Sequence, residues 1–240
     1  MDFLEREKRD EDAGEPEGRF YDLKEVVPPS SREESLRFFS GIFGNDKPLV
    51  VEIGSGNGHF LVNYAERHPG SNYIGTEILT GRARRFSSKL KKRNVTNVII
   101  FWGDTRRFVW DFLYEDSVEE FIVMFPDPWP KMRHHKHRLI SNGFILMLYI
   151  RLAAGGKISV ATDYEEYRDF IIREFGKVPG LRNMFSNGYS AYPEDYPKTL
   201  FEDRFRKEGK PIYYMQWVKE GDAAGGAPQG SSHRVRRRNM

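Results

Sequence analysis

The sequence predicts an α/β fold in which helices cover both faces of a mainly parallel sheet. The first observation is that short apolar runs rich in β-branched residues alternate with amphipathic segments five times between residues 49 and 175. This alternation is typical of parallel strands joined by crossover helices. The second is a glycine-rich turn, residues 54–58, directly after the first run. The third is that several runs end at an acidic residue. With two closing strands, the expected sheet has seven strands.

Each expected element has its own signal. Ser30 and Ser31 precede Glu33 and Glu34, a capping-box pattern that opens a helix. The expected strands are residues 49–53, 72–78, 98–101, 121–125 and 157–161, followed by 181–185 and 212–218, with an antiparallel strand among the last two. The expected helices after the first strand begin at about residue 59 and then cover residues 80–93, 105–113, 137–153 and 164–175.

Composition limits the class of protein. The 240 residues are enough for one sizeable domain. Cysteine is absent, which excludes disulfides and thiolate metal sites and fits a reducing compartment. The longest apolar run, residues 144–150, is far shorter than the roughly 18 residues of a membrane span. The N-terminus is too acidic for a signal peptide. We therefore expect a cytoplasmic protein without a membrane partner. For the oligomeric state, a monomer and a homodimer are both left open.

Charge and composition also divide the chain. The net charge is +3, with a balance of −5 in residues 1–17, so that the remaining residues carry +8. Residues 1–18 have too little apolar surface to order themselves, and residues 219–240 are rich in Gly, Ala, Ser and Arg. We expect a flexible acidic arm at 1–18, one domain at 19–218 and a disordered basic tail at 219–240. A basic domain points weakly towards nucleic acid.

The segment 121–137 is the most informative stretch. An apolar run stops at Pro126-Asp127-Pro128-Trp129-Pro130, and a basic, histidine-rich stretch follows. Three prolines in five residues cannot continue a strand or a helix, because each lacks an N–H and has a fixed φ. One carboxylate and one indole are therefore held at a strand end beside positive charge, which suggests a site for a polyanion. The alternative is a proline-rich surface turn beside a solvated run of charges.

Acidic residues and glycines recur where the parallel strands end, which is where open α/β sheets bind their ligands. They are Glu52 with Gly54, Gly56 and Gly58, then Glu77, Asp104, Asp127 and Asp163. The spacing G-x-G-x-G beside an acid suits a nucleoside and a cationic amino group better than a pyrophosphate. Glu77 lies 23 residues after Gly54, near the spacing of an acid that binds ribose hydroxyls. A ligand with an adenosine, an ammonium and no phosphate is S-adenosylmethionine. Taken singly, each acid is more often a solvated or capping carboxylate.

These motifs resemble the tRNA (guanine-N7-)-methyltransferase family of the bacterial, single-chain type. The matching segments are VEIGSGNG at 51–58, GTEI at 75–78, GD at 103–104, FPDPWPKMRHHKHR at 125–138, ATD at 161–163 and TLFE at 199–202. The resemblance covers roughly residues 30–218. It implies a class I S-adenosylmethionine-dependent methyltransferase (Rossmann-like) fold, with S-adenosylmethionine as methyl donor. It also implies methylation of N7 of a guanine in the variable loop of tRNA.

The resemblance assigns roles residue by residue. The donor-site acids are Glu52, Glu77, Asp104 and Asp127, with the glycine turn beside them, and Asp127 is also the catalytic residue. The expected substrate-binding residues are Lys131, Asp163, Thr199 and Glu202. The expected RNA contacts are Arg133, His134, His135, Lys136 and Arg138. No metal site is expected, because no carboxylate or thiolate stands at ligand spacing among these histidines.

The chemistry of guanine N7 supports one role for Asp127. N7 bears a lone pair and no proton, so methyl transfer from a sulfonium needs no general base. A carboxylate can instead stabilise the positive charge that develops on the purine. Trp129 is expected either to stack on a base or to pack within the turn. The basic outer side of helix 80–93 is either a second phosphate-binding face or a solvated surface.

Two other functions fit the same residues. Asp127-Pro128-Trp129 also resembles the acidic-Pro-aromatic motifs of enzymes that methylate exocyclic amines. The third possibility is a non-catalytic RNA-binding module on the same fold, which the acids at every strand end disfavour.

Overall fold

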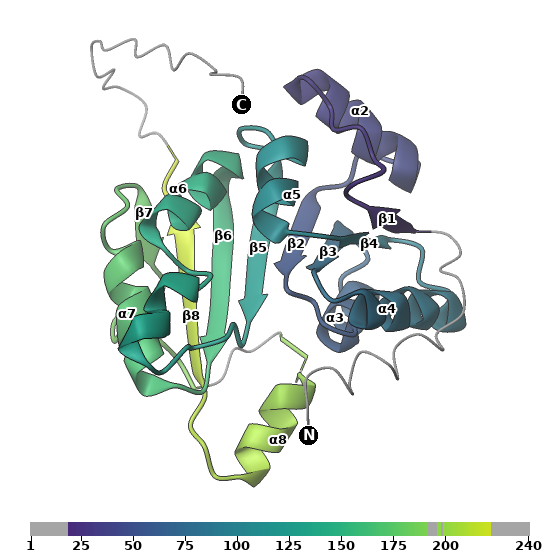
Figure 1. The fold of residues 1–240 in the computed structure, drawn as a ribbon. Coiled ribbons are helices and arrows are strands. Elements are labelled where there is room, and N and C mark those ends of the chain that lie inside the picture. The colour runs from purple at the N-terminus through teal and green to yellow at the C-terminus, as the bar shows by residue number, and fades with distance from the viewer. Residues whose placement is uncertain (1–18, 192–195, 198, 222–240) are drawn as a thin grey trace, which may run out of the picture.

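A computed structural model describes residues 19–191, 196–197 and 199–221, which form one sheet with helices on both sides (Figure 1). The strand order is β1-β4-β3-β2-β5-β6-β8-β7, and neighbours from β1 to β6 are parallel. β8 is antiparallel to both β6 and β7. The strands are β1 (Phe20–Asp22), β2 (Leu49–Ile53), β3 (Asn72–Glu77), β4 (Val98–Trp102), β5 (Val118–Met124), β6 (Leu152–Thr162), β7 (Leu181–Asn183) and β8 (Tyr213–Lys219).

The mainly parallel sheet and the antiparallel closing strand are confirmed, but the described residues form eight strands where seven were expected. The additional strand is β1, which pairs with β4 through Tyr21 and Phe101 at the sheet's edge. A strand of three half-buried residues shows too few positions for a period of two to stand out.

Two groups of helices cover the two faces of the sheet. α2, α5, α6 and α7 pack on one face with the larger apolar cluster, and α3 and α4 pack on the other with the second cluster. The helices are α2 (Arg32–Phe43), α3 (His59–Arg67), α4 (Thr80–Arg93), α5 (Thr105–Phe112), α6 (Asn142–Arg151), α7 (Glu165–Phe175) and α8 (Leu200–Lys207), with a 3-10 helix η1 (Met132–His137). The cap expected at the start of α2 is present, because the Ser31 side chain accepts from the Glu34 N–H.

The expectation of one helix over residues 137–153 is wrong. The basic stretch forms η1, the chain then leaves the helical path, and α6 begins only after Ser141. The Ser141 hydroxyl accepts a hydrogen bond from the Phe144 N–H and caps the helix. The helix is also shorter than expected at its far end, because β6 already begins at Leu152. α8 was not expected from the sequence.

The register of the parallel strands brings their carboxyl ends to one edge of the sheet. Ile53 pairs with Thr76, Glu77 pairs with Trp102, and Met124 pairs with Ala161. The residues that follow these strands therefore lie along the same edge. β8 runs in the opposite direction, so its first residue, Tyr213, and the α8 helix before it also lie at this edge (Figure 1).

Most of the expected N-terminal arm and C-terminal tail cannot be compared with the structure. The arm at 1–18 and residues 222–240 of the tail lie outside the described residues. Lys219, where the tail was expected to begin, is the last residue of β8, and its ammonium donates to Asp116 and to the Leu152 carbonyl at 2.8 and 2.7 Å. No helix within residues 19–191, 196–197 and 199–221 is long and apolar enough to cross a membrane.

Gly75 lies in the middle of β3, where the sheet packs closely against α4, so a substitution there tests this packing. A Cβ at this position would lie 2.5 Å from the Phe86 ring and 2.7 Å from the Ser55 hydroxyl. We expect Gly75→Ala to lower the free energy of unfolding by about 1–3 kcal/mol, because both neighbours are buried and must shift. Chemical denaturation measures this change.

Gly41 provides the matched control. It lies in α2, and a Cβ there would meet no atom within 4 Å. Gly41→Ala should leave the free energy of unfolding unchanged or raise it by about 0.5–1 kcal/mol, since alanine is the better helix former. A Gly75→Ala protein as stable as Gly41→Ala would contradict this account of the packing.

Candidate active site

The glycine turn follows β2 at the centre of the sheet, where the chain order reverses between β3 and β5. Gly54, Gly56 and Gly58 all have left-handed backbones, with φ of 73°, 56° and 69°. A Cβ on Gly58 would also lie 2.1 Å from the Phe86 ring. The turn therefore needs glycine both for its conformation and for its approach to α4, and it presents backbone rather than side chains.

Glu77 at the end of β3 is in direct contact with this turn. Its Oε2 accepts from the Gly56 N–H at 2.9 Å, and its Oε1 accepts from the Leu79 N–H at 2.8 Å. Only 5% of the residue is exposed. The carboxylate that was expected to bind ribose hydroxyls thus lies beside the glycines, and its two hydrogen bonds hold their turn in place.

Glu52 lies on β2, one residue before the strand ends, and is 2% exposed. No described residue donates a hydrogen bond to its buried Oε2. Burial raises the pKa of Glu52 to about 8 and Glu77 adds to the shift, while Ser55 and Lys89 act in the opposite direction. A buried carboxylate oxygen without a partner is costly unless a ligand donor completes it. The ammonium expected of the ligand is a donor of this kind.

Asp104 lies where it was expected, two residues beyond the pairing of Glu77 with Trp102. The preceding Gly103 donates its N–H to the Glu77 carbonyl at 2.9 Å, which keeps the ends of β3 and β4 together. Asp104 is exposed and caps α5, with Oδ1 accepting from the Arg106 N–H at 2.7 Å. Asp104 is therefore a capping carboxylate, which was the alternative expectation for each acid.

The loop after β5 presents Asp127 in a constrained backbone. Phe125 and Trp129 on either side of it have left-handed φ of 54° and 45°, which is uncommon for residues with a side chain. The Phe125 N–H donates to the Ala161 carbonyl at 2.8 Å and ties the loop to β6. Asp127 is exposed, and no described residue donates a hydrogen bond to its carboxylate.

The basic stretch after this loop divides into two kinds of residue. Lys131, Arg133 and Lys136 are exposed, while His134 and His135 are half-buried. Arg138 is 3% exposed, and its guanidinium forms its hydrogen bonds inside the protein. The structure thus gives Arg138 an internal role, unlike the other residues expected to contact RNA.

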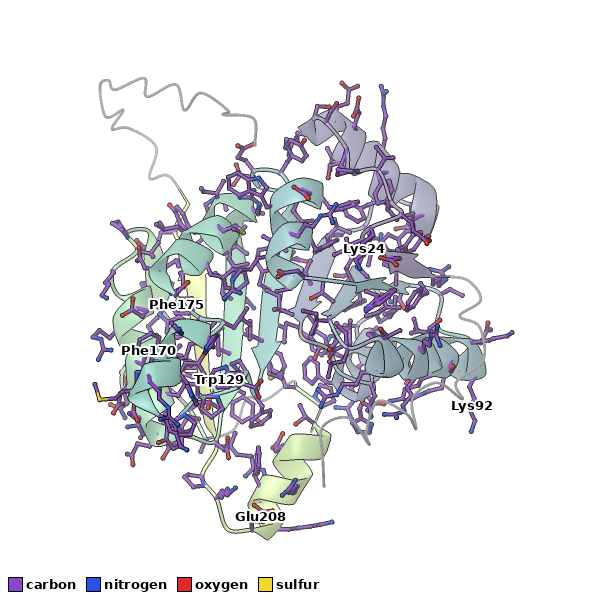
Figure 2. The ribbon with its side chains drawn as sticks, viewed as in Figure 1. Lys24, Lys92, Trp129, Phe170, Phe175 and Glu208 are labelled. Carbon is purple, nitrogen blue, oxygen red and sulfur yellow. The ribbon has the colours of Figure 1, made fainter. Side chains whose placement is uncertain are left out.

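Trp129 packs against the histidines of η1, with ring centroids 5.8 Å from His134 and 5.3 Å from His137. It remains 36% exposed, at the end of the molecule where β5 finishes (Figure 2). The turn-packing alternative therefore describes part of its surface and leaves the rest open. No group of three or more histidine or acidic residues in the described part of the chain can hold a metal ion.

The remaining expected substrate residues lie in α8 or close to its ends. The Thr199 hydroxyl accepts from the Glu202 N–H at 2.9 Å and caps the helix. Glu202, 4% exposed, accepts from Arg206 at 2.7 Å. Asp163 follows β6, and its Oδ2 lies 3.8 Å from the Lys210 ammonium. All three expected residues are at the same edge as Asp127, but Thr199 and Glu202 already have partners within the protein.

The outer side of α4 lies elsewhere. Lys92, near the end of this helix, is on the opposite side of the molecule from Trp129 (Figure 2). Arg93 donates to Asn63 at 2.7 Å and also contacts Glu66. Part of this basic face is therefore neutralised by α3.

Sequence analysis missed a buried polar cluster on β5. Glu120 accepts from Ser159 at 2.7 Å and from the hydroxyls of Tyr196 and Tyr64, and the two tyrosine rings stack with centroids 5.2 Å apart. Burial raises the pKa of Glu120, and its hydrogen bonds oppose the shift. The cluster fastens Tyr196, three residues before Thr199, to the sheet. An acid within an apolar strand, VEEFIVM, was the available signal.

Comparison with known proteins finds relatives that match most of the chain. A family model described as a putative methyltransferase matches residues 46–215. The chain is 36% identical over 177 residues to the tRNA (guanine-N(7)-)-methyltransferase of Bordetella pertussis, covering 74% of this chain and 69% of that protein. It belongs to the tRNA (guanine-N(7)-)-methyltransferase family. Another member, from Leifsonia xyli subsp. xyli, is also 36% identical over 177 residues and is covered to 78%.

Solved structures extend the comparison to the fold. The antibiotic-resistance methyltransferase Kmr aligns with a TM-score of 0.55 at 13% identity, covering 84% of this chain and 99% of that one. A 30S ribosomal methyltransferase from an uncultured bacterium aligns with a TM-score of 0.53 at 19% identity, covering 81% of this chain and 97% of that one. At these identities the likeness concerns the fold alone. The class I methyltransferase fold expected for a family member is confirmed.

The raised pKa of Glu52 predicts a pH-dependent effect on stability. Below about pH 4.5 the carboxyl is protonated in both the folded and the unfolded chain, and stability is lost as the pH rises through about 8, where ionisation is forced on the buried group. We expect Glu52→Gln to raise the free energy of unfolding of the ligand-free protein by about 1–4 kcal/mol at pH 9 and to change it little at pH 5. Urea denaturation at the two pH values measures the difference.

The control is Glu25→Gln, which replaces an exposed carboxylate and should have no such pH-dependent effect. A Glu52→Gln protein that is destabilised equally at pH 5 and pH 9 would show that the buried carboxylate is not under strain.

Proposed function

We propose that this protein transfers a methyl group from S-adenosylmethionine to N7 of a guanine in the variable loop of tRNA. The observation that carries the proposal is its 36% identity, over most of both chains, to family members named for this reaction. The acids at the ends of the parallel strands support it, because the strand register places them along one edge of the sheet.

The glycine turn and its two acids are the proposed donor site. Gly54, Gly56 and Gly58 let the backbone approach the donor, Glu77 accepts from ribose hydroxyls, and Glu52 is available for the ammonium. Asp104 contributes next to Glu77, and Asp127 from the far side of the turn. When bound, S-adenosylmethionine supplies an electrophilic methyl group on a positively charged sulfur.

Asp127 is the proposed catalytic residue, acting through its charge and position. Guanine N7 needs no base, because its lone pair is free, so the carboxylate stabilises the positive charge that the purine acquires. Its exposure and the absence of a donor among the described residues leave that charge available to a substrate. The constrained backbone of its loop limits the positions of the Asp127 carboxylate, which favours an in-line approach of the reacting atoms.

The proposed tRNA surface follows the same loop. Lys131, Arg133 and Lys136 are exposed there and can neutralise phosphates, with His134 and His135 beside them. The open part of Trp129 is placed to stack on a base, an interaction of about 1–3 kcal/mol in other proteins. We leave Arg138 out of this surface because it is buried.

Asp163, Thr199 and Glu202 are the proposed contacts to the guanine edge. Carboxylates and hydroxyls can accept from N1–H and the N2 amine, which adenine lacks on that edge. Glu202 is already paired with Arg206 through Oε1, so its contact with guanine has to accommodate or replace this ion pair. We further place the reaction in the cytoplasm, with the protein acting as a monomer or homodimer.

The activity is tested with labelled S-adenosylmethionine and tRNA transcripts, followed by mapping of the modified nucleoside. We expect label on one guanine of the variable loop, and no label when 7-deazaguanosine replaces it, because the attacking nitrogen is then absent. Label that survives this replacement would favour an exocyclic-amine methyltransferase. A protein that binds tRNA but not the methyl donor in equilibrium dialysis would favour the non-catalytic RNA-binding module.

Substitution of Asp127 tests its charge. We expect Asp127→Asn to lower kcat by roughly 10²-fold, the scale of removing one electrostatic group from a transition state. Steady-state kinetics at saturating donor and tRNA measure it. The matched control, Asp111→Asn, removes a carboxylate that pairs with Arg107 on α5 and should leave kcat unchanged. Near wild-type turnover by Asp127→Asn would contradict a major role for the charge.

A further inference from the structure

The guanidinium of Arg138 contacts the backbone of the loop that carries Asp127. Arg138 Nε donates to the carbonyl oxygen of Pro128 at 2.8 Å. Pro128 directly follows Asp127, so this hydrogen bond fixes the Pro128–Trp129 peptide plane, one residue after the proposed catalytic residue. The bond spans ten residues of chain and closes the segment that contains η1.

The guanidinium is itself fixed by α7. It lies over the rings of Tyr167 and Phe170, each with a centroid 4.8 Å from Cζ. Its Nη2 donates to Glu166 Oε1 at 3.1 Å. Cation–π contacts and a charge-assisted hydrogen bond give the side chain a defined direction, since arginine presents its donors in a rigid fork. Phe170 and Trp129 lie at the same side of the molecule (Figure 2).

The backbone of Arg138 is held as well. Its carbonyl accepts from Arg106 of α5 at 3.3 Å, and its N–H donates to the His135 carbonyl at 3.0 Å. Arg138 therefore connects the Asp127 loop, η1, α5 and α7. Tyr167 lies near both Arg138 and Asp127. Burial raises the pKa of Tyr167 to about 12, the Asp127 charge raises it further and the Arg138 charge lowers it.

Burial separates Arg138 from the residues that can meet RNA. Only 1% of its side chain is exposed, whereas Arg133, five residues earlier, is exposed on η1. A phosphate cannot reach the Arg138 guanidinium without displacing the aromatic rings and Glu166. The same side chain that sequence analysis assigned to RNA is thus turned towards the catalytic loop.

The backbone of the Asp127 loop is strained and needs contacts such as the Arg138 hydrogen bond to keep its conformation. Phe125 and Trp129 both adopt left-handed backbones, which cost of order 1–3 kcal/mol each and persist only where the surroundings determine them. The first is tied to β6 by its own N–H, and its ring packs on Phe205 of α8. Between the two lies the Pro128 carbonyl, whose described hydrogen-bond partner is Arg138.

We propose that Arg138 is a positioning residue for methyl transfer, which holds the Asp127 carboxylate in its productive orientation by clamping the Pro128 carbonyl to α7. The proposal rests on the proposed function, because it assigns a consequence for turnover. It implies that loss of the clamp lowers kcat through Asp127 and leaves the affinity for tRNA unchanged.

Arg138→Lys tests the clamp while keeping the positive charge. Lysine is a point donor on a flexible stem and cannot bond Pro128 and Glu166 in the same fork geometry. We expect kcat to fall by at least about tenfold, since a misplacement of about 1 Å can cost 10²-fold, and the KM for tRNA to stay within about twofold. Arg133→Ala is the comparison and should raise the KM for tRNA, because it removes an exposed phosphate contact.

A control variant and two measurements distinguish a positioning role of Arg138 from general destabilisation of the fold. Arg37→Lys, at an exposed arginine that pairs with Glu33 on α2, controls for the substitution and should leave kcat unchanged. The melting temperature and the affinity for S-adenosylmethionine should show that Arg138→Lys remains folded. If Arg138→Lys does not fold, Glu166→Gln replaces it, because it removes the carboxylate anchor from the surface and should lower kcat in the same way.

The decisive experiment is a double-mutant cycle with Asp127→Asn. If Arg138 acts through Asp127, adding Arg138→Lys to Asp127→Asn should reduce kcat by less than about twofold further. Fully multiplicative losses, or an Arg138→Lys enzyme in which the KM for tRNA rises while kcat is retained, would overturn the proposal. A wild-type protein that binds the donor and does not methylate tRNA would instead refute the proposed function, so the two failures are distinguishable.

Discussion

The parallel register of β4, β3, β2, β5 and β6 is the constraint on which the rest of this structure depends. Each of these strands contains or precedes one of the acids, β2 also precedes the glycine turn, and acids from different strands are at least 23 residues apart in the sequence. Hydrogen bonding between neighbouring strands fixes where each strand ends to within a residue, so the positions of the acids follow from pairing of apolar strands. A slip of one residue in β2 would turn Glu52 towards the opposite face.

The site combines carboxylates in very different conditions. Glu77 is buried and satisfied by two backbone N–H groups, whereas Glu52 is buried with one oxygen unpaired, and Asp127 is exposed. A satisfied carboxylate gives shape to the glycine turn, while an unsatisfied one stores unfavourable free energy that a cationic donor can relieve. The unpaired oxygen of Glu52 therefore lowers the stability of the folded protein.

The sequence predicted much of this arrangement because local signals and the fold agree. The cap of α2, the glycine turn and the strand-end acids each follow from residue type and spacing. The spacing from Gly54 singled out Glu77, which the structure places in contact with Gly56 of the same turn. The sequence was less informative where one residue type serves two purposes. Thr199 and Glu202 form a capping pattern as readily as a substrate site, and Arg138 reads as one more charge in a basic run. Burial decides between such alternatives, and burial depends on tertiary packing.

The Asp127 loop, with its two left-handed residues, depends on hydrogen bonds from residues outside the loop. Prolines on both sides of Asp127 remove backbone donors and limit φ, so the loop cannot stabilise itself with a local ladder of hydrogen bonds. Its carbonyls must find donors elsewhere, and a long side chain that enters from the far end of η1 is one solution. A helix such as α7, packed on the sheet and starting next to Asp163, is a rigid base for that side chain. Arg138 therefore connects the loop after β5 with the helix after β6, although it belongs to neither strand.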